Sequence, residues 1–205
     1  MDLYFAPLAC SMATRIALYE AGAEARFIQV DQKAKRAGDE DFWAVNPMGQ
    51  VPVLRTDDGR LVTENVAVLS HIAGRFPALG HDDRDGLLQW LAFIGTELHK
   101  AVFIPLLVRE TPDEVKAHAR RNAGRPLGVL SSHLEKSDTL LGRFTVADAY
   151  LVTVLHWAHF AKALDLASWP VLNAYLDRHF QRPSVARALS EEIALFKEEL
   201  ARRAA

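Results

Sequence analysis

Short apolar runs alternate with helical patterns over the first part of the chain. The runs "LYF" at residues 3–5 and "ARFIQV" at residues 25–30 are typical of strands, and "MATRIALYEAG" between them has helical spacing and ends at Gly22. Two later apolar runs flank Asp58-Gly59, a pair typical of a hairpin turn, and "NVAVLSHIAGRF" again has helical spacing. With a short helix before the hairpin, the pattern predicts the order β-α-β-α-β-β-α, a mixed α/β layer.

The rest of the chain has a helical pattern. Before it, residues 77–86 carry Pro77, Gly86 and a run of charge, which is typical of a linker. The sequence therefore predicts an α/β domain of residues 1–76 and an all-helical domain of residues 87–205. The expected helices cover residues 82–107, 112–135, 145–163, 170–181 and 184–203.

The start of one helix is marked by its residues. In "FTVADAYL", Thr145 precedes an apolar helical run and Asp148 lies three residues later. The Thr145 side chain can accept from the Asp148 backbone N–H, and the Asp148 carboxylate can accept from the Thr145 N–H. This is a capping box in which Asp replaces the commoner Glu or Gln. We expect this helix to be central and well nucleated.

The chain has 205 residues, half of them hydrophobic, so it can bury a sizeable core. Its 24 basic and 26 acidic residues give a net charge of −2, which excludes the strongly basic surface of a typical nucleic-acid-binding protein. The first residues lack the pattern of a signal peptide, and the most apolar later stretch, 151–167, carries two histidines, a lysine and an aspartate. We therefore expect a cytoplasmic protein that binds neither nucleic acid nor a membrane.

The single cysteine, Cys10, lies where the first strand gives way to the first helix. It cannot form an internal disulfide, and Ala13 stands where a Cys-x-x-Cys motif has its second cysteine, so redox chemistry would need an external thiol. The free N–H groups and the positive dipole of a helix start favour a thiolate, which would make Cys10 reactive. Alternatively, Cys10 is a buried residue that acts as a small hydrophobe.

Three other places could contribute to a site. Pro52 heads an apolar strand and could follow a cis or, more commonly, a trans peptide bond. Glu64, in "TEN" where a strand ends and a helix begins, could bind a ligand ammonium or belong to an ordinary helix cap. His99 lies on a long expected helix, where a single histidine is more often structural than catalytic. His156 and His159 share a helical face, but no third ligand accompanies them, so no metal site is expected.

The order of these features resembles that of the glutathione S-transferase family. A strand-turn-helix with a thiol, then "NPMGQVPVL", then "LVTEN", then a helical half with "FTVADAYL" covers nearly the whole chain. The cysteine in "ACSMA", where other classes use Tyr or Ser, together with "TELHKAVFIPLLVRETPDE" and "FTVADAYLVTVLHWA", resembles the bacterial beta class. The resemblance implies a thioredoxin-like domain, a helical domain and a homodimer. It also implies glutathione as co-substrate in a cleft between the domains, with no other cofactor.

The resemblance implies roles in binding the tripeptide. Val51, before a cis-Pro52, would pair its backbone with the cysteinyl part of glutathione. Glu64 and Asn65 would hold the γ-glutamyl end, and Lys35 would meet the glycine carboxylate. Asn65 departs from the Ser or Gly usual in the class, although its amide can still bind a carboxylate.

Around the sulfur, the resemblance implies that Cys10 faces the glutathione thiol and that His99 lines the site beside it. A hydrophobic pocket for the second substrate is expected near Phe103, Ile104 and Trp157.

A second departure is Ala92, where the class often has an Asn that reaches the glutathione of the partner subunit. Glu97 could replace the missing contact. Losing one such hydrogen bond would cost roughly 0.5–1.5 kcal/mol of binding free energy. These departures bear on affinity more than on fold.

The main hypothesis is an enzyme, a glutathione transferase that lowers the pKa of the bound thiol and joins its sulfur to hydrophobic electrophiles. Because one thiolate beside another is unfavourable, Cys10 is expected to favour thiol-disulfide exchange through a mixed disulfide with glutathione. One alternative is a non-enzymatic interaction module with the same fold, which typically lacks the glutathione-binding side chains. Another is a carrier of hydrophobic compounds with negligible turnover.

Overall fold

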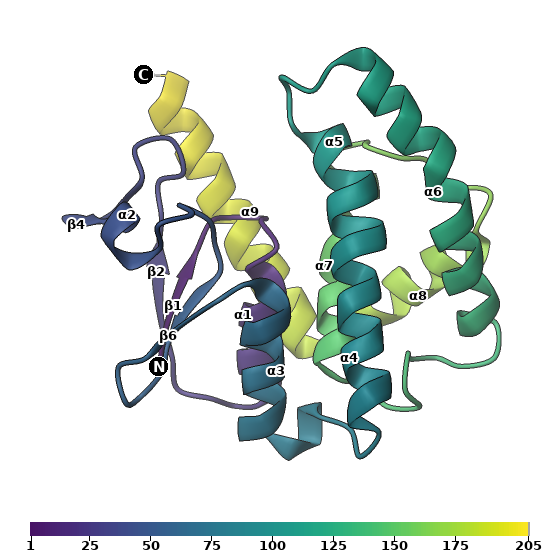
Figure 1. The fold of residues 1–205 in the computed structure, drawn as a ribbon, viewed down its shortest axis with the longest axis horizontal. Helices are drawn as coiled ribbons and strands as arrows, with labels where there is room; N and C mark the ends of the chain where they lie inside the picture. The colour runs from purple at the N-terminus through teal and green to yellow at the C-terminus, as the bar shows by residue number, and fades with distance from the viewer. Residues whose placement is uncertain (205) are drawn as a thin grey trace.

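The computed structural model describes residues 1–204 and has two parts, a small sheet with its own helices and a larger group of helices (Figure 1). The sheet-bearing part consists of β1 (Asp2–Phe5), α1 (Met12–Glu20), β2 (Arg26–Gln29), β3 (Arg36–Ala37), β4 (Glu40–Asp41), α2 (Phe42–Val45), β5 (Val53–Arg55), β6 (Leu61–Thr63) and α3 (Asn65–Arg75). The predicted order β-α-β-α-β-β-α is confirmed. The hairpin of β3 and β4 is an addition, too short to leave a periodic pattern in the sequence.

The four main strands form one sheet in the order β2-β1-β5-β6. β1 is parallel to β2, and the other pairs are antiparallel. Since alternate residues of a strand point to opposite faces, β1 serves two cores. Leu3 and Phe5 join Leu54 in the main core with α1 and α3, whereas Tyr4 and Val53 join a smaller core with α2. Both faces of the sheet are therefore covered.

The helical part begins with one long helix over residues 84–107. It comprises α4 (Arg84–Phe93), a π-helical segment η2 (Ile94–Phe103) and α5 (Ile104–Leu107). The short 3-10 turn η1 (Pro77–Leu79) precedes it, and α6 (Asp113–Leu134), α7 (Val146–Phe160), α8 (Pro170–Phe180) and α9 (Pro183–Ala204) follow. The five expected helices are present, with ends shifted by at most three residues. The π-helical segment leaves no sequence signal, and such segments often mark functional sites.

The long helix over residues 84–107 is also notable for its length and apolar composition. Within the described chain it is the one helix that has the length and apolar composition of a membrane span. This is a weak sign, because the core helices of soluble proteins share both properties.

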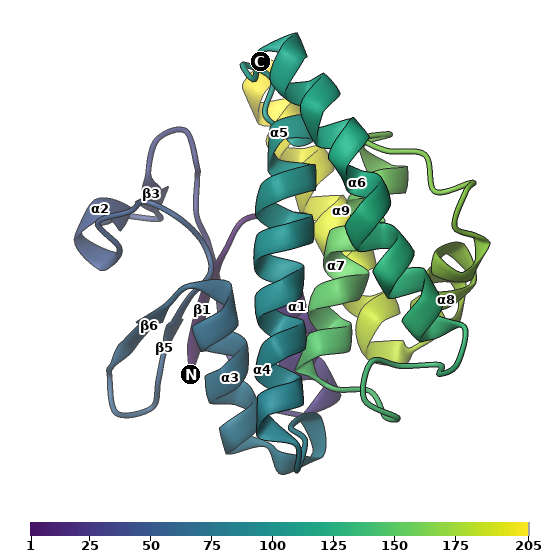
Figure 2. The same cartoon turned by 45° about the vertical axis from the view of Figure 1, so that its right-hand side comes forward.

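The two parts share one continuous core. α1 packs against α7 and α9, and its buried residues belong to the same cluster as those of α3, α4, α6 and α8. After α8 the chain turns back, and α9 runs along the sheet-bearing part (Figure 1, Figure 2). At the end of β2, the Gln29 side-chain amide donates to Glu199 of α9, with Nε2 and Oε2 3.3 Å apart. The C-terminal helix therefore reaches the part in which the chain begins.

The start of α7 has the predicted capping box. The Asp148 carboxylate accepts from the Thr145 N–H at 2.9 Å, and the Thr145 hydroxyl accepts from the Ala147 N–H at 3.3 Å. The fully buried Asp148 also accepts from the Leu140 N–H at 2.9 Å and from the Tyr175 hydroxyl at 3.0 Å. The box thus ties α7 to the preceding loop and to α8, which makes this helix central, as expected.

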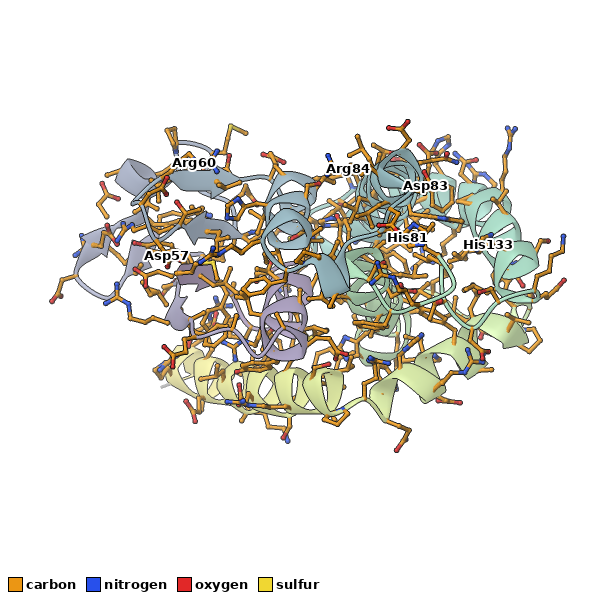
Figure 3. The ribbon with its side chains drawn as sticks, turned by 90° about the horizontal axis from the view of Figure 1, so that it is seen from below. Asp57, Arg60, His81, Asp83, Arg84 and His133 are labelled. Atoms are coloured by element: carbon orange, nitrogen blue, oxygen red, sulfur yellow. The ribbon has the colours of Figure 1, made fainter. Side chains whose placement is uncertain are left out.

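The connection between the two parts ends in a helix cap. Figure 3 shows this end of the molecule, where His81, Asp83 and Arg84 lie at the start of α4. The Asp83 side chain accepts from the Gly86 N–H at 2.9 Å. Residues 84–86 of the expected linker are therefore already helical.

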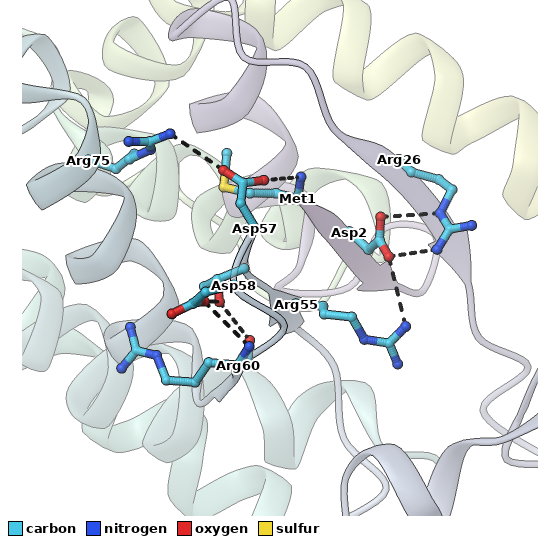
Figure 4. Close-up of polar contacts among 9 residues, drawn as sticks. Met1, Asp2, Arg26, Arg55, Asp57, Asp58, Arg60 and Arg75 are labelled. Carbon is cyan, nitrogen blue, oxygen red and sulfur yellow. Dashed lines mark hydrogen bonds and ion pairs between the residues drawn. The ribbon is translucent and has the colours of Figure 1, made fainter.

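Ion pairs hold the edge of the sheet, as Figure 4 shows. Asp57, in the turn between β5 and β6, binds the Met1 ammonium at 2.8 Å and Arg75 of α3 at 3.4 Å. On the neighbouring strands, Asp2 binds Arg26 at 2.6 Å. Pairs as exposed as these are screened by solvent and contribute little to stability. They fix the ends of elements, whereas the core holds the fold.

Candidate active site

A cavity of about 750 Å³ lies between the two parts, and its wall takes residues from both. The sheet-bearing part contributes Cys10, Val51, Pro52, Glu64 and Asn65, and the helical part contributes His99, Ile104 and Trp157. Eight of the ten residues singled out in the sequence therefore line one cavity, and Lys35 and Phe103 do not. The volume lies in the usual range of small-molecule sites.

The loop that carries Cys10 is held at Leu8, from two sides. Leu8 has a φ of 60°, a left-handed conformation that is unusual for a leucine. Its N–H donates to the Glu192 carboxylate of α9 at 2.7 Å, and its carbonyl accepts from the Trp157 indole N–H of α7 at 2.8 Å. Glu192 is fully buried, and its other carboxylate oxygen lies 3.3 Å from Nε of the buried Arg15. Burial raises the pKa of Glu192 to about 8, although Arg15 and the Leu8 N–H act to lower it. Two helices of the other part thus set the position of this loop.

The Cys10 thiol is held in its neutral form. Its S–H donates to the Val51 carbonyl, with Sγ and O 3.3 Å apart. Burial raises the pKa of the Cys10 thiol to about 12, and the opposing effects of Lys100 and of the N–H groups of Cys10 and Ser11 are smaller. The helix start was expected to favour a thiolate, but in this structure desolvation of the sulfur outweighs it.

The turn opposite Cys10 contains a cis peptide bond between Val51 and Pro52. Lys35 lies beside this turn, and its ammonium donates to the Gln32 side-chain oxygen at 2.9 Å and to the Gly49 carbonyl at 2.8 Å. Gln32 lines the cavity, and its side-chain nitrogen is buried without a protein partner among residues 1–204. Lys35 therefore orients an amide that faces the cavity.

The start of α3 brings Glu64 and Asn65 to the cavity wall. Glu64 is the N-cap residue of α3, with a φ of 65°, and its side chain makes no capping hydrogen bond, so its carboxylate is not used by the cap. The Asn65 amide is buried, and its oxygen accepts from the Thr14 hydroxyl at 3.5 Å. Its side-chain nitrogen has no hydrogen-bond partner in the described part of the chain. A helix start with a free amide donor suits a carboxylate.

His99 lies on the π-helical segment, with its ring buried against Trp157. Its Nδ1 and the Tyr150 hydroxyl oxygen are 2.7 Å apart, and its ring centroid is 5.1 Å from that of Trp157. Burial lowers the pKa of His99 to about 4, and the nearby Lys100 lowers it further. The imidazole is therefore neutral at pH 7 and can exchange hydrogen bonds with a thiol.

The apolar end of the cavity differs from the expectation at one residue. Phe103 is fully buried behind Trp157, at 6.0 Å between ring centroids, and does not line the cavity. It packs into the core beneath the pocket, while Ile104 and Trp157 form the wall. The wall continues to Phe160 of α7 and Phe196 of α9.

Several lining residues were missed in the sequence. Tyr150, Phe160 and Phe196 lie in helices whose apolar residues all resembled core positions, so their sequence pattern did not separate wall from core. Gln32 follows a strand, where a turn residue gives no sign of a ligand site. Of the missed residues, Lys100 alone could have been predicted from the sequence, because it is a cation directly after the candidate site residue His99. Within residues 1–204, no group of three or more His, Cys, Asp or Glu is placed to hold a metal ion.

Comparisons with known proteins bear on the whole chain. The family model described as "Glutathione S-transferase, N-terminal domain" matches residues 1–74, and "Glutathione S-transferase, C-terminal domain" matches residues 113–178. Glutathione S-transferase GstA of Escherichia coli O157:H7 is 40% identical over 200 residues, which cover 94% of this chain and 98% of that protein.

Solved structures agree with these sequence matches. The structure of a sphingomonad glutathione S-transferase complexed with glutathione is 42% identical, with a TM-score of 0.87 over 94% of this chain and 98% of that one. A bacterial beta class glutathione S-transferase of Sphingomonas chungbukensis is 40% identical, with a TM-score of 0.87 and the same coverage. The likeness therefore extends through both parts of the fold and across the cavity between them.

Proposed function

Because this chain belongs to the glutathione S-transferase family, we propose that its cavity holds glutathione with the sulfur beside Cys10 and joins it to hydrophobic electrophiles. The chain is a glutathione transferase of the bacterial kind, similar to the beta class. The observation that supports the assignment of its site is the convergence of eight candidate residues from both parts of the fold on one cavity.

The proposed binding mode follows the polar groups along the wall. The γ-glutamyl carboxylate lies at the start of α3, where Asn65 has an unpartnered amide donor and Glu64 can meet the α-ammonium. The backbone of Val51 pairs with the cysteinyl part. At the glycine end, the Gln32 amide donates to the carboxylate, and Lys35 acts through Gln32 and contributes its charge. In this proposed binding mode each residue has the role expected from the sequence except Lys35, which contacts the glycine carboxylate through Gln32 and not directly.

The proposed chemistry needs a glutathione thiolate. His99 is neutral at pH 7 and lies on the cavity wall, so its imidazole can accept a hydrogen bond from the incoming thiol; with a pKa lowered to about 4 it does not keep the proton, which passes to solvent as the thiolate forms. Lys100 adds a positive charge to the same wall, which favours the anion that forms. Cys10 is a neutral thiol and can donate its S–H to that anion. The repulsion between two thiolates, expected from the sequence, therefore does not arise in the resting site, and conjugation becomes compatible with Cys10.

Thiol-disulfide exchange at Cys10 remains a second proposed reaction of the same site. The Cys10 thiolate attacks one sulfur of glutathione disulfide, the new S–S bond joins Cys10 to one glutathionyl group, and the other leaves as a thiolate. The step first requires the loss of a proton from a thiol whose pKa is near 12. Exchange at neutral pH is consequently expected to be slower than at an ordinary, exposed cysteine.

The first test is calorimetric titration of the reduced protein with glutathione. Saturable binding at about one molecule per chain, followed by turnover with a hydrophobic electrophile, is the expected result. Saturable binding of a hydrophobic compound without turnover would instead indicate the carrier alternative. The absence of binding at several millimolar glutathione would overturn the proposed site and favour the interaction module. An Asn65→Ala variant should bind roughly tenfold more weakly, because it loses the carboxylate donor.

Substitution of Cys10 separates the two proposed reactions. In Cys10→Ala, exchange with glutathione disulfide should be lost, because the chain has no other cysteine. Conjugation should fall by about tenfold or less, since only one S–H donor to the thiolate is removed. Exchange that persists unchanged in this variant would contradict the role of Cys10 as the attacking thiol.

The assembly and the location of the protein are also proposals. We propose a homodimer of chains that each contain a thioredoxin-like domain (1–76), a linker (77–86) whose last three residues already belong to α4, and a helical domain (87–205). The half-exposed Trp43 and the exposed Met48, of which Met48 also lines the cavity, supply apolar surface for such an assembly. The mass of the protein in light scattering tests the dimer. A cytoplasmic location would keep the single thiol reduced.

A further inference from the structure

We propose that Phe160 and Phe196 form an aromatic wall that makes this transferase select flat, aromatic electrophiles over aliphatic ones of similar size. The inference rests on the proposed transferase function and names the substrate class of the same cavity. It concerns the part of the cavity wall where side chains of α7 and α9 meet.

The two rings are 36 residues apart in the sequence and are in contact in the fold. Phe160 is the last residue of α7, and Phe196 lies on α9, which runs past the end of α7 (Figure 2). Their ring centroids are 5.7 Å apart, with an interplanar angle of 75°, an edge-to-face arrangement. Both side chains line the cavity.

The plane of Phe160 is fixed from behind. The buried His156, one turn earlier on α7, stacks on Phe160 at 5.2 Å between centroids and an interplanar angle of 26°. Phe180 of α8 in turn meets His156 edge-on at 6.2 Å. Phe160 is nevertheless 42% exposed, so the ring is backed by His156 and still offers apolar surface. A ring held in this way can accept a third flat ring in a stack, at the usual centroid separation of about 4.5–7 Å.

The wall lies within reach of the reacting sulfur. Trp157 and Phe160 are three residues apart on α7, so their side chains are neighbours on one helical face, with Cβ atoms about 5–6 Å apart. Trp157 contacts the His99 ring and the loop of Cys10. A ring stacked on Phe160 can therefore place its substituent beside the glutathione sulfur. Ile104 and Leu107, which also line the cavity, are aliphatic and supply no plane of their own.

The test compares two conjugates that differ in one feature. S-benzylglutathione and S-hexylglutathione carry the same tripeptide and apolar groups of similar size, one flat and one flexible. Calorimetry should show tighter binding of the benzyl conjugate to the native protein. Because an aromatic pair adds binding beyond the area it buries, Phe160→Leu should reduce the benzyl-to-hexyl affinity ratio by roughly two- to tenfold. Phe196→Leu should reduce it less, since this ring meets Phe160 only at its edge.

Two further variants test whether a change in the affinity ratio comes from loss of the aromatic ring or from a general disturbance of the helices. Phe160→Tyr keeps the ring and should keep the ratio. Leu200→Ala removes an exposed apolar side chain one turn beyond Phe196 on α9, outside the cavity, and should also leave the ratio unchanged. Affinity for unmodified glutathione should be the same in all variants and shows that each one folds.

Specific outcomes overturn the inference. A ratio unchanged in Phe160→Leu, or a native protein that binds both conjugates equally, would rule out the aromatic wall while leaving the transferase function intact. Equal loss in Leu200→Ala would show a general effect of α9. A native protein that binds neither conjugate nor glutathione would overturn both the wall and the proposed site.

Discussion

Two fully buried carboxylates, Asp148 and Glu192, illustrate two uses of the same chemistry in this molecule. Asp148 accepts hydrogen bonds from neutral groups within the helical part, among them the Thr145 N–H three residues away. Glu192 instead reaches from α9 to the backbone of Leu8, 184 residues away in the sequence, and faces the Arg15 guanidinium. Burial raises the pKa of both groups.

The difference lies in what each carboxylate holds. Asp148 joins pieces of the scaffold, so its hydrogen bonds contribute to folding wherever the site lies. Glu192 holds a left-handed residue two positions before Cys10, so its hydrogen bond also fixes the sulfur. A buried carboxyl group is costly to place in a protein unless hydrogen bonds or an ion pair satisfy its oxygens, and each of these two has such partners. Substitutions can separate these two roles.

The largest effect is expected for Asp148→Ala. The change leaves the Leu140 and Thr145 N–H groups and the Tyr175 hydroxyl buried without their acceptor. At about 1–3 kcal/mol for each unpaired group, the free energy of unfolding should fall by at least about 3 kcal/mol. Urea denaturation measures it. A loss smaller than that of the Glu192 variant below would reverse the assignment of scaffold and site roles.

Glu192→Leu should be less destabilising and should change the thiol. Loss of the hydrogen bond to Leu8 and of the ion pair with Arg15 should lower the free energy of unfolding by about 2–3 kcal/mol. With Leu8 released, Cys10 should become more solvated, and the pKa of its thiol should fall toward the ordinary value of 9.0. Each unit of that fall raises the rate of iodoacetamide alkylation at neutral pH about tenfold, through the thiolate fraction.

The neighbouring Glu191 provides the matched control for Glu192. It is partly exposed and binds Arg15 at 3.1 Å and the Tyr19 hydroxyl, but it makes no hydrogen bond to Leu8. Glu191→Ala should therefore disturb the same arginine and leave the alkylation rate of Cys10 unchanged. Faster alkylation in both variants would mean that Arg15, and not the Leu8 contact, positions the sulfur.

The same contrast between local and distant contacts explains what the sequence could predict. The capping box of Thr145 and Asp148 spans three residues, and the four strands of the main sheet and the long helices follow from local periodicity, so these were predicted. The short β3–β4 hairpin and the π-helical segment leave no such pattern and were missed. Two other features depend on where α9 lies after the chain turns back, and no local sequence pattern predicts that position. They are the place of Phe196 in the cavity wall and the hydrogen bond from the Leu8 N–H to Glu192. For Cys10 the sequence left open a thiolate favoured by the helix start and a buried, neutral thiol. The burial that raises its pKa follows from tertiary packing, which a local pattern does not show.

The pH dependence of stability gives a smaller and more specific effect. The folded state holds Glu192 with a pKa near 8, against 4.5 as its ordinary value, so between these values the folded state binds more protons than the unfolded chain. The free energy of unfolding therefore falls as the pH rises through this window. His99, His156 and His179 act in the opposite sense, because their folded pKa values near 4 lie below 6.5, but their contribution is complete above about pH 6.5.

Between pH 6.5 and 8 the effect of Glu192 should stand alone among these groups. The native protein should lose about 1–2 kcal/mol of unfolding free energy over this interval. The neutral variant Glu192→Gln should show no such slope, and urea titrations at the two pH values measure both. A slope that is equal in the two proteins would assign the titration to another group.

The smallest expected effect concerns the scaffold alone. Thr145→Ala removes the acceptor of the Ala147 N–H and a hydroxyl donor to Asp148, 3.0 Å away, and should lower the free energy of unfolding by about 1 kcal/mol. Thr145→Ser keeps both bonds and should recover most of the loss. Neither change should alter the alkylation rate of Cys10 or the affinity for glutathione. Thr145 lies at the start of α7 and makes neither of the two hydrogen bonds that hold Leu8, which come from Glu192 and Trp157. A change in alkylation would mean that the start of α7 also sets the position of Trp157, which together with Glu192 holds Leu8. Asp148 and Glu192 would then both position the sulfur, and the separation of scaffold and site roles would fail.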